Sequence, residues 1–372
     1  MNDAILTCSL DFPRVSPGSA ASYVRMIERL LEHVNGQLKT NPGIDGLIGC
    51  NPLNLMRTVQ QNHASFMSTI ITLNSVELLI RTVPWMYRAY HARGFTYDYF
   101  FVELIAWQIA VAECFDQPDQ KTEIMSVYKW LAEHHEDLIK LSLTGAAPSF
   151  SVRDEADEMR QVFLLLLLEG DSYGCLRLVE QSIRTADDLR HFYLHVIWPA
   201  MCAIGQQWEY NRISVAEEHL ATAIVGRVMA GLYPMISLCG VTCGKVVVSA
   251  GPNEFHEVGA RMVADFMEMD GWDVTYLGAN VPANVLLDTL RIQKPFILAL
   301  SIATVFNLGN GQELIRIVKE DPETRDIKLM VGGLAFKDMP HLWKEIGADG
   351  YAADAHSATL LSKEWWSERG YA

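Results

Sequence analysis

The stretch that decides the fold is residues 245–278, KVVVSAGPNEFHEVGARMVADFMEMDGWDVTYLG. It opens with a β-branched run at 246–248 that breaks at Gly251. Apolar residues at helical spacing follow, and Gly271 separates them from a second strand-like run. The stretch therefore predicts a strand, a loop, a helix and a second strand. In open parallel sheets ligands bind at the carboxyl ends of the strands, so the loop is a candidate site.

β-rich and helical runs alternate through the last part of the chain, residues 241–372. The alternation predicts right-handed crossovers and a Rossmann-like, parallel five-stranded sheet. A flavodoxin-like order, 2-1-3-4-5, would bring the loops after the first, third and fourth strands to one edge. The first strand is not followed by Gly-x-Gly-x-x-Gly, which disfavours a dinucleotide site. The expected strands are 245–250, 273–277, 296–301, 327–332 and 349–352, and the expected helices are 257–270, 282–292, 310–320, 338–346 and 355–367.

His256 follows Glu254 by two residues in the loop after the first strand. It is a candidate metal ligand whose second ring nitrogen Glu254 would orient, or else a surface histidine beside a solvated carboxylate. The stretch resembles the cobalamin-binding domain family, whose signature is Asp-x-His-x-x-Gly, a helix, and a strand ending in Leu-Gly. The resemblance implies that His256 replaces the cofactor's own base as the lower cobalt ligand and that Gly259 completes the motif. Glu254 stands where the family has Asp, a variation shared with its light-sensing branch.

Two further elements match the same family at about its spacing. Ser301 opens Ser-Ile-Ala-Thr, which ends at Thr304, and Gly332 and Gly333 follow the fourth expected strand. In the family these elements line the channel for the detached nucleotide tail of the cofactor. Small residues suit such a channel because they let a ligand approach the backbone closely.

Residues 151–240 read as a bundle of four short helices, the last three near 172–183, 187–210 and 214–233. Ser151 or Asp154 is expected to cap the first of them. The segment 204–219 resembles the helical cap that precedes cobalamin domains in corrinoid methyltransferase proteins and in light-dependent repressors. Within it Trp208 is followed by nine residues and then by Glu-His, which marks the light-sensing branch.

The resemblance assigns tasks to three residues of this cap. Trp208 would cover the upper face of the corrin ring and favour an adenosyl group. Glu218 would accept hydrogen bonds from ribose hydroxyls, and His219 would become the upper cobalt ligand after photolysis. The alternative makes Trp208 a core anchor and Glu218-His219 an exposed helix pair.

The local sequence also predicts how the fourth cap helix begins. Ser214 and Glu217 form the pattern of a capping box. Asn211 stands where the family commonly has Gly, at a turn that needs a positive φ, and Asn tolerates that conformation.

Residues 1–150 predict an all-helical domain of globin-like size, with helices near 18–37, 53–71, 74–93, 97–115 and 119–142. Aromatic residues crowd its centre between 84 and 107, with Arg81, Arg88, His91 and Arg93 interleaved. The stripe is either core packing or a pocket for a flat conjugated molecule whose carboxylates pair with arginines. The whole layout resembles the photocobilins, which combine cobalamin with a linear bilin, and so implies biliverdin as a second chromophore.

Two side expectations concern this domain. Cys114 is a weak candidate for a covalent thioether to the bilin. His134 and His135 lie in a charged segment and are interpreted as solvated.

Composition limits the classes of function. A net charge of −15 and an isoelectric point near 5.2 argue against binding to nucleic acid or an anionic membrane. The seven cysteines are odd in number and scattered, which fits a reducing cytoplasm, and Cys239 and Cys243 are taken as ordinary core thiols. The apolar runs 162–168 and 220–241 are interpreted as buried helix surface, and no signal peptide is expected at 1–13.

The first hypothesis is a cytoplasmic, non-enzymatic light sensor that holds adenosylcobalamin between cap and sheet. Photolysis would change cobalt ligation and the assembly of a homo-oligomer, which acts on an effector enzyme or regulator. The alternative is a corrinoid protein that carries methyl groups for a methyltransferase. A regulator that acts without adenosyl chemistry is a third class, and direct DNA binding is disfavoured.

Overall fold

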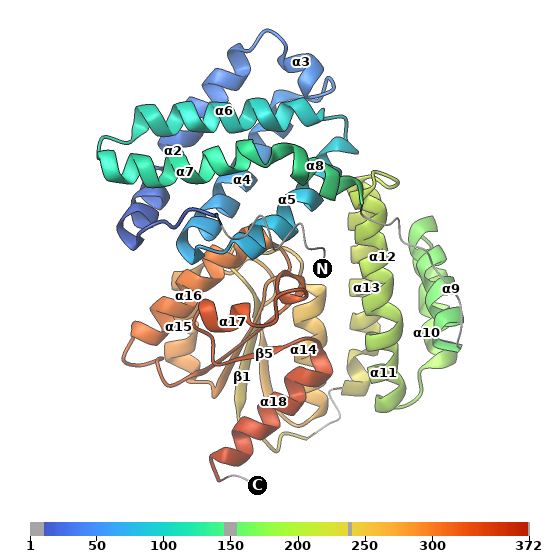
Figure 1. The fold of residues 1–372 in the computed structure, drawn as a ribbon. Coiled ribbons are helices and arrows are strands. Elements are labelled where there is room, and N and C mark those ends of the chain that lie inside the picture. Colours follow the sequence, from blue (N-terminus) through green and yellow to red (C-terminus); the bar gives the residue numbers. More distant parts are fainter. Residues whose placement is uncertain (1–10, 145–154, 237–239, 371–372) are drawn as a thin grey trace. The chain divides into compact units, whose positions relative to one another are not determined.

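The computed structural model describes residues 11–144, 155–236 and 240–370 (Figure 1). The chain separates into two compact units. Unit 1 comprises residues 1–148 and 209–211, and unit 2 comprises residues 149–208 and 212–372. The predicted divisions near residues 150 and 240 stay predictions, and each unit is described by itself.

Unit 1 is all-helical in its described residues, as predicted. Side-chain caps fix the starts of several helices: Ser16, Ser75 and Thr96 accept hydrogen bonds from the first turns of α2, α5 and α6. Asn74 ends α4 with φ 49°. The helices are α2 (Pro17–Thr40), α3 (Ile44–Leu47), α4 (Leu53–Leu73), α5 (Val76–His91), α6 (Tyr97–Cys114), α7 (Pro118–Glu133) and α8 (His135–Leu143).

Two expectations for this unit are wrong. The helix predicted at 119–142 is interrupted at His134, and the short helix α3 was not predicted. His135 is not solvated: it is 5% exposed, and its Nδ1 lies 2.9 Å from the Tyr87 hydroxyl. Burial of the imidazole is tolerated because a hydrogen-bond partner replaces water.

The aromatic stripe is largely core packing. Tyr99 and Trp107 are fully buried, and the rings of Tyr87 and Phe100 stack at 4.1 Å between centroids. Arg81 pairs with a carboxylate of its own helix, so it does not support the predicted role in binding a ligand carboxylate.

A buried polar network lies within this aromatic core. Gln60 Nε2 donates to the Tyr99 hydroxyl and to Glu103 Oε1, both at 2.8 Å, and Gln60 Oε1 accepts from Trp107 Nε1 at 2.8 Å. His63 Nδ1 lies 3.6 Å from the same Glu103 oxygen. Burial raises the pKa of Glu103 to about 8 and lowers the pKa of His63 to about 3. Both side chains are therefore neutral near pH 7.

Glu103 should make stability depend on pH. The pKa of Glu103 is raised from 4.5. Its contribution to the free energy of unfolding is therefore fully present below pH 4.5 and is lost as pH rises through about 8. We expect Glu103→Gln to remove this dependence. Relative to wild type, the free energy of unfolding of the variant should be higher at about pH 9 than at about pH 5 by on the order of 2–4 kcal/mol. Denaturant unfolding of the full chain at both pH values measures the effect. The exposed Glu28→Gln is the control, and equal pH dependence in wild type and Glu103→Gln would contradict the expectation.

The helical cap of unit 2 contains α9 (Glu155–Glu169), α10 (Ser172–Ser182), α11 (Ala186–Phe192), α12 (Trp198–Glu209) and α13 (Val215–Ile236). The helix predicted at 187–210 is continuous, but a π-helical segment, Tyr193–Ile197, lies between α11 and α12. Thr185 and Asp188 form a capping box at the start of α11. The predicted caps Ser151 and Asp154 lie outside the described residues.

Within the described part of the chain, α13 is the one helix long and apolar enough to cross a bilayer. One of its faces, which includes Ile224, Val228 and Leu232, packs against α9, α10 and α14 in a hydrophobic cluster. Leu220 and Tyr233 are exposed, so the expectation of buried helix surface for residues 220–241 holds for one face of the described part, 220–236.

The sheet is parallel and has the predicted order, β2-β1-β3-β4-β5. Ala250 pairs with Ser301, and Ser301 pairs with Gly332, so the carboxyl ends of three strands lie at one edge. The strands are β1 (Lys245–Ala250), β2 (Asp273–Tyr276), β3 (Ile297–Ser301), β4 (Lys328–Gly332) and β5 (Gly350–Ala352). The helices are α14 (Val258–Met269), α15 (Ala283–Gln293), α16 (Leu308–Glu320), α17 (Leu342–Glu345) and α18 (Ala355–Glu368).

One predicted helix of the sheet domain is mostly absent. Residues 338–346 form only the single turn of α17. Pro340 accounts for the difference, because it has no N–H to donate and disfavours helical conformation in the residue before it.

Cap and sheet share one hydrophobic core along α14. Met262 and Phe266 of α14 belong to the same cluster as the buried cap residues. The Tyr193 hydroxyl donates to Asp265 at 2.7 Å, and Arg190 pairs with Asp270 at 2.8 Å. The cap is thereby fixed against the sheet domain within unit 2 (Figure 1).

Candidate functional site

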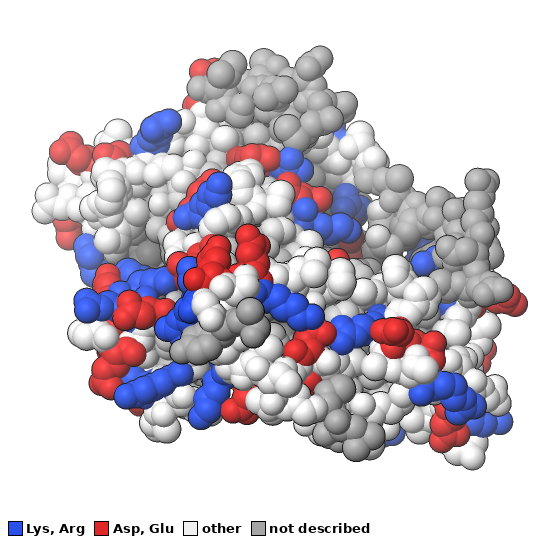
Figure 2. Space-filling view, turned by 90° about the horizontal axis from the view of Figure 1, so that it is seen from below, with Lys and Arg blue, Asp and Glu red and all other residues white. Residues whose placement is uncertain are grey.

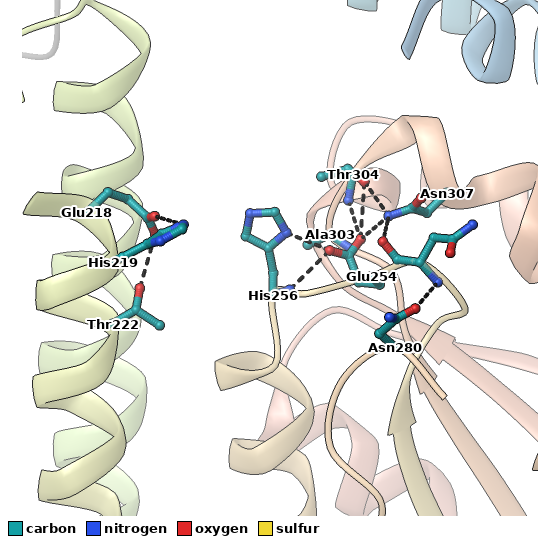
Figure 3. A network of polar contacts seen from close by, with 10 residues as sticks. Glu218, His219, Thr222, Glu254, His256, Asn280, Ala303, Thr304 and Asn307 are labelled. Carbon is teal, nitrogen blue, oxygen red and sulfur yellow. Dashed lines mark hydrogen bonds and ion pairs between the residues drawn. The ribbon is translucent and has the colours of Figure 1, made fainter. Parts of the chain in front are cut away.

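The loop after β1 is built around one buried carboxylate. Glu254 Oε1 accepts hydrogen bonds from the backbone N–H of His256 at 3.1 Å and from its Nδ1 at 2.5 Å. Oε2 accepts from the N–H groups of Ala303 and Thr304, at 3.0 and 2.9 Å, and from the Thr304 hydroxyl and the Asn307 amide, at 3.2 and 3.1 Å (Figure 3). The Glu254 side chain is 1% exposed. Oε1 is therefore held by His256 of the same loop, and Oε2 is held by the segment that follows β3.

This network sets the charge and orientation of His256. Burial would raise the pKa of Glu254, but the hydrogen bonds and charge of His256 together with donors from Thr304 and Asn307 lower it to about 2. The hydrogen bond to Glu254 raises the pKa of His256. An ionised carboxylate at Nδ1 favours the tautomer that carries its proton there and directs Nε2 outward. The His256 side chain is 61% exposed, so Nε2 is accessible to a ligand.

Glu218 and His219 approach the same region from the cap. They lie in the first turn of α13 and point toward the ring of His256 from the opposite side (Figure 3). Glu218 Oε1 accepts from the Thr222 hydroxyl at 3.0 Å, and the His219 side chain is 74% exposed. The charge of Glu218 contributes to the raised pKa of His256. The structure thus brings these three predicted site residues together across one space.

The turn between α12 and α13 has the predicted geometry. Asn211 has φ 54°, the left-handed conformation expected there. Ser214 N donates to Glu217 Oε2 at 2.7 Å, and Glu217 N donates to Ser214 Oγ at 3.2 Å, which is a reciprocal capping box. Trp208 lies in the last turn of α12, just before this turn.

The predicted small residues line one hollow. Gly259, Ser301, Gly332 and Gly333 all contribute to a hollow of about 60 Å³, partly open to solvent, between α14 and the sheet. This space is called the α14 hollow below. Thr304 does not line it, contrary to its predicted place in the tail channel, because its N–H and hydroxyl both turn to Glu254.

The glycines of the α14 hollow serve different purposes. Gly333 has φ 103°, and a Cβ there would collide with the carbonyl of Ile302, so the backbone itself requires glycine. A Cβ at Gly332 would lie 2.6 Å from the Ala352 carbonyl oxygen. At Gly259 the nearest atom would be Ser301 Oγ at 3.7 Å, an ordinary contact. The missing Cβ at Gly259 therefore leaves room for a ligand rather than for the protein.

Asn307, Leu194 and Trp198 were not predicted to take part. Asn307 donates to Glu254, and its position at the carboxyl edge after β3 is the signal that could have identified it. Leu194 and Trp198 line the α14 hollow from the cap, and no local pattern marks them.

The donor set fits a corrin-bound metal. His256 offers a single imidazole nitrogen backed by a buried carboxylate, which suits a metal whose other ligands come from the ring of its cofactor. Over the described residues no group of three or more His, Cys, Asp or Glu side chains could hold a metal ion by itself. Cys239, one of the two thiols considered above, lies outside those residues.

Comparison with known protein families agrees with this geometry. Residues 244–360 match the family described as the B12 binding domain, and residues 159–233 match a second family of the same description. The first segment contains all five strands, and the second spans the cap helices. Two segments of unit 2, one helical and one containing the sheet, therefore each match a B12 binding domain family.

The chain is similar to the HTH-type transcriptional repressor CarH of Myxococcus xanthus, at 26% identity over 218 residues, which are 58% of this chain and 71% of the repressor. Monomethylamine corrinoid protein 1 of Methanosarcina mazei is 23% identical over 204 residues, 53% of this chain and 92% of that protein. Dimethylamine corrinoid protein 1 of the same organism is 26% identical over 122 residues, 32% of this chain and 55% of that protein.

One solved structure shares the fold. The monomethylamine corrinoid protein of Methanosarcina barkeri superposes with a TM-score of 0.50 at 18% identity, over 56% of this chain and 98% of that protein. The helical cap and the five-stranded parallel sheet thus share the Rossmann-like fold of that corrinoid protein.

Proposed function

We propose that this protein is a non-enzymatic light sensor that holds adenosylcobalamin between the helical cap and the sheet of unit 2. The observation that carries the proposal is the placement of His256, held by Glu254, opposite Glu218 and His219. When bound, adenosylcobalamin supplies a cobalt–carbon bond that light can break. A carrier of small alkyl groups has no need for a carboxylate and a second imidazole on the upper side.

Each residue has a distinct role in this proposal. His256 Nε2 binds cobalt from below, and Glu254 holds the proton on Nδ1. Trp208 covers the upper face of the corrin, and Glu218 accepts hydrogen bonds from the adenosyl ribose. His219, exposed and adjacent to Glu218, would be available to hold the cobalt once the adenosyl group has left.

A second chromophore, biliverdin, is proposed for unit 1. A cavity of about 20 Å³ there is lined by aromatic and apolar residues together with His63 and Glu103. It is much smaller than the usual ligand pocket, so binding a bilin would require these side chains to move apart. Cys114 is 1% exposed and burial raises the pKa of its thiol, so a thioether there is not part of the proposal. Absorbance spectra of the full chain with and without added biliverdin test it.

The output is proposed to pass through protein contacts rather than through catalysis or DNA. A light-dependent homo-oligomer would signal to a separate effector enzyme or regulator. On the face shown in Figure 2, basic side chains lie among acidic ones and form no single basic patch. With a net charge of −15, this surface disfavours direct nucleic-acid binding.

Assembly in the dark and after green light tests the proposed function. Protein loaded with adenosylcobalamin in the dark is expected to change its oligomeric state on illumination, as measured by light scattering after size-exclusion chromatography. Apo-protein illuminated in the same way is the control. An unchanged assembly with a photolysed cofactor would contradict the proposal.

The second candidate is a methyl carrier, favoured by the similarity to mono- and dimethylamine corrinoid proteins. The same experiment separates the two functions. A carrier is expected to bind methylcobalamin and adenosylcobalamin alike and to show no adenosyl-dependent change in assembly.

Substituting Gly259 by alanine should weaken cofactor binding while sparing the fold. An added Cβ makes only an ordinary contact with the protein but occupies the α14 hollow. We expect about a tenfold loss of affinity for cobalamin, the size of a modest overpacking penalty. Gly36→Ala, where a Cβ meets nothing within 4 Å, is the matched control. Wild-type affinity in Gly259→Ala would show that the ligand does not use this space.

A further inference from the structure

Helix α12 has a tryptophan near each end. Trp198 is its first residue, and Trp208 lies in its last turn. Ten residues of α-helix separate the two, which corresponds to about 15 Å along the axis. Trp208 is the residue proposed above to cover the upper face of the corrin. Trp198 has no role in that proposal.

Trp198 lines the α14 hollow together with Leu194 from the π-helical segment. Across the hollow lie Gly259 and the small residues Ser301 and Gly333, and the family resemblance assigns the last two to the channel for the nucleotide tail. The cap therefore supplies part of the wall of a channel otherwise formed by the sheet domain.

The exposure of Trp198 differs from that of the structural aromatic residues of unit 2. Phe163, Phe266 and Trp272 are at most 1% exposed, as expected for side chains that only fill a core. Trp198 is half-buried and borders the hollow. Trp198 therefore packs against the hydrophobic cluster of unit 2 and also contributes to the wall of the hollow.

The surrounding contacts hold this wall in position. Tyr193, five residues before Trp198, donates its hydroxyl to the buried Asp265 of α14 at 2.7 Å. Arg190 pairs with Asp270 at the end of the same helix at 2.8 Å. The π-helical segment, which begins at Tyr193 and leads into α12, changes the helical phase, and such segments are frequent at functional sites.

We propose that Trp198 is a specificity-determining residue that contacts the aromatic base of the detached nucleotide tail, so that α12 meets the cofactor at both ends. This inference rests on the proposed binding of cobalamin by unit 2. It adds that the cap recognises the tail as well as the upper face. Tail recognition and cap position are thereby coupled through one helix.

Comparison of two ligands in the dark tests the inference. Adenosylcobalamin carries the nucleotide tail, and adenosylcobinamide has the same corrin and adenosyl group without it. We expect wild type to bind the first more tightly. Trp198→Ala is expected to lower the affinity for adenosylcobalamin about tenfold, as loss of one base–aromatic stack does, and to change adenosylcobinamide binding less than about twofold. Dissociation constants come from absorbance titrations.

Two further variants complete the design. Trp198→Phe retains an aromatic wall and should recover most of the affinity for adenosylcobalamin. Trp343→Ala removes a half-buried tryptophan of α17 that does not line the hollow, and should bind both ligands as wild type does.

Each outcome bears on a different claim. Loss of preference for adenosylcobalamin in Trp198→Ala, with intact cobinamide binding, supports the inference and shows that the variant is folded. Equal weakening of both ligands would overturn it, because Trp198 would then serve the fold alone, and so would wild-type binding of both. If wild type binds neither ligand, the proposed function itself is wrong.

Discussion

Replacing His256 by alanine is expected to lower the affinity for adenosylcobalamin by at least about a hundredfold, because the proposed function makes this imidazole the one protein ligand to cobalt in the dark state. The ring is 61% exposed, so its removal leaves no buried cavity and should not unfold the loop. Absorbance titration in the dark gives the affinity, and circular dichroism reports the fold.

His191→Ala is the matched control for this substitution. His191 is an exposed histidine on α11, outside the site, and its loss should leave binding unchanged. Tight binding by His256→Ala, with the same spectrum as wild type, would mean that cobalt takes its lower ligand from elsewhere.

Replacing Glu254 by glutamine is expected to have the second largest effect. The carboxylate accepts hydrogen bonds from His256, from two backbone N–H groups and from Thr304 and Asn307. In glutamine one carboxylate oxygen is replaced by an NH2 group, which cannot accept hydrogen bonds from these donors. The loop that holds His256 should therefore change its conformation. We expect an affinity loss of about 10- to 100-fold, the range for a group that orients a metal ligand. A fall in stability of about 1–3 kcal/mol should accompany it, since buried donors lose their acceptor.

Asn307→Ala provides the graded comparison for Glu254→Gln. It removes one of several donors to Oε2 and leaves the carboxylate in place, so a severalfold loss is expected. Should Glu254→Gln be less stable yet bind as tightly as wild type, the carboxylate would serve the loop and not the ligand. Measuring both the free energy of unfolding and the affinity in each variant separates the two roles.

The sheet domain could be predicted because its signals are local. The β-branched run at 246–248 and the alternation of strands with helices define a parallel sheet, and the chirality of its crossovers restricts the order. The pair Glu254 and His256 could be identified for the same reason, since two residues of one loop carry its chemistry. The positive φ of Asn211 could be predicted because few residue types other than glycine adopt that conformation.

What could not be predicted depends on contacts between distant segments. The hydrogen bond of Thr304 to Glu254 joins residues fifty positions apart, and no local motif indicates it. Trp198 reaches the α14 hollow only because the cap packs on α14. His135 was interpreted as solvated from its charged neighbours, whereas its burial depends on Tyr87 of another helix.

Coordination of cobalt by His256 is the central claim, and electron paramagnetic resonance tests it most directly. The protein is labelled with nitrogen-15 at histidine only and loaded with unlabelled cob(II)alamin in the dark. One coordinated histidine nitrogen splits each cobalt line into a doublet, and we expect this doublet in wild type and not in His256→Ala. A triplet in labelled wild type, from a nitrogen-14 ligand of the cofactor's own base, would contradict the account.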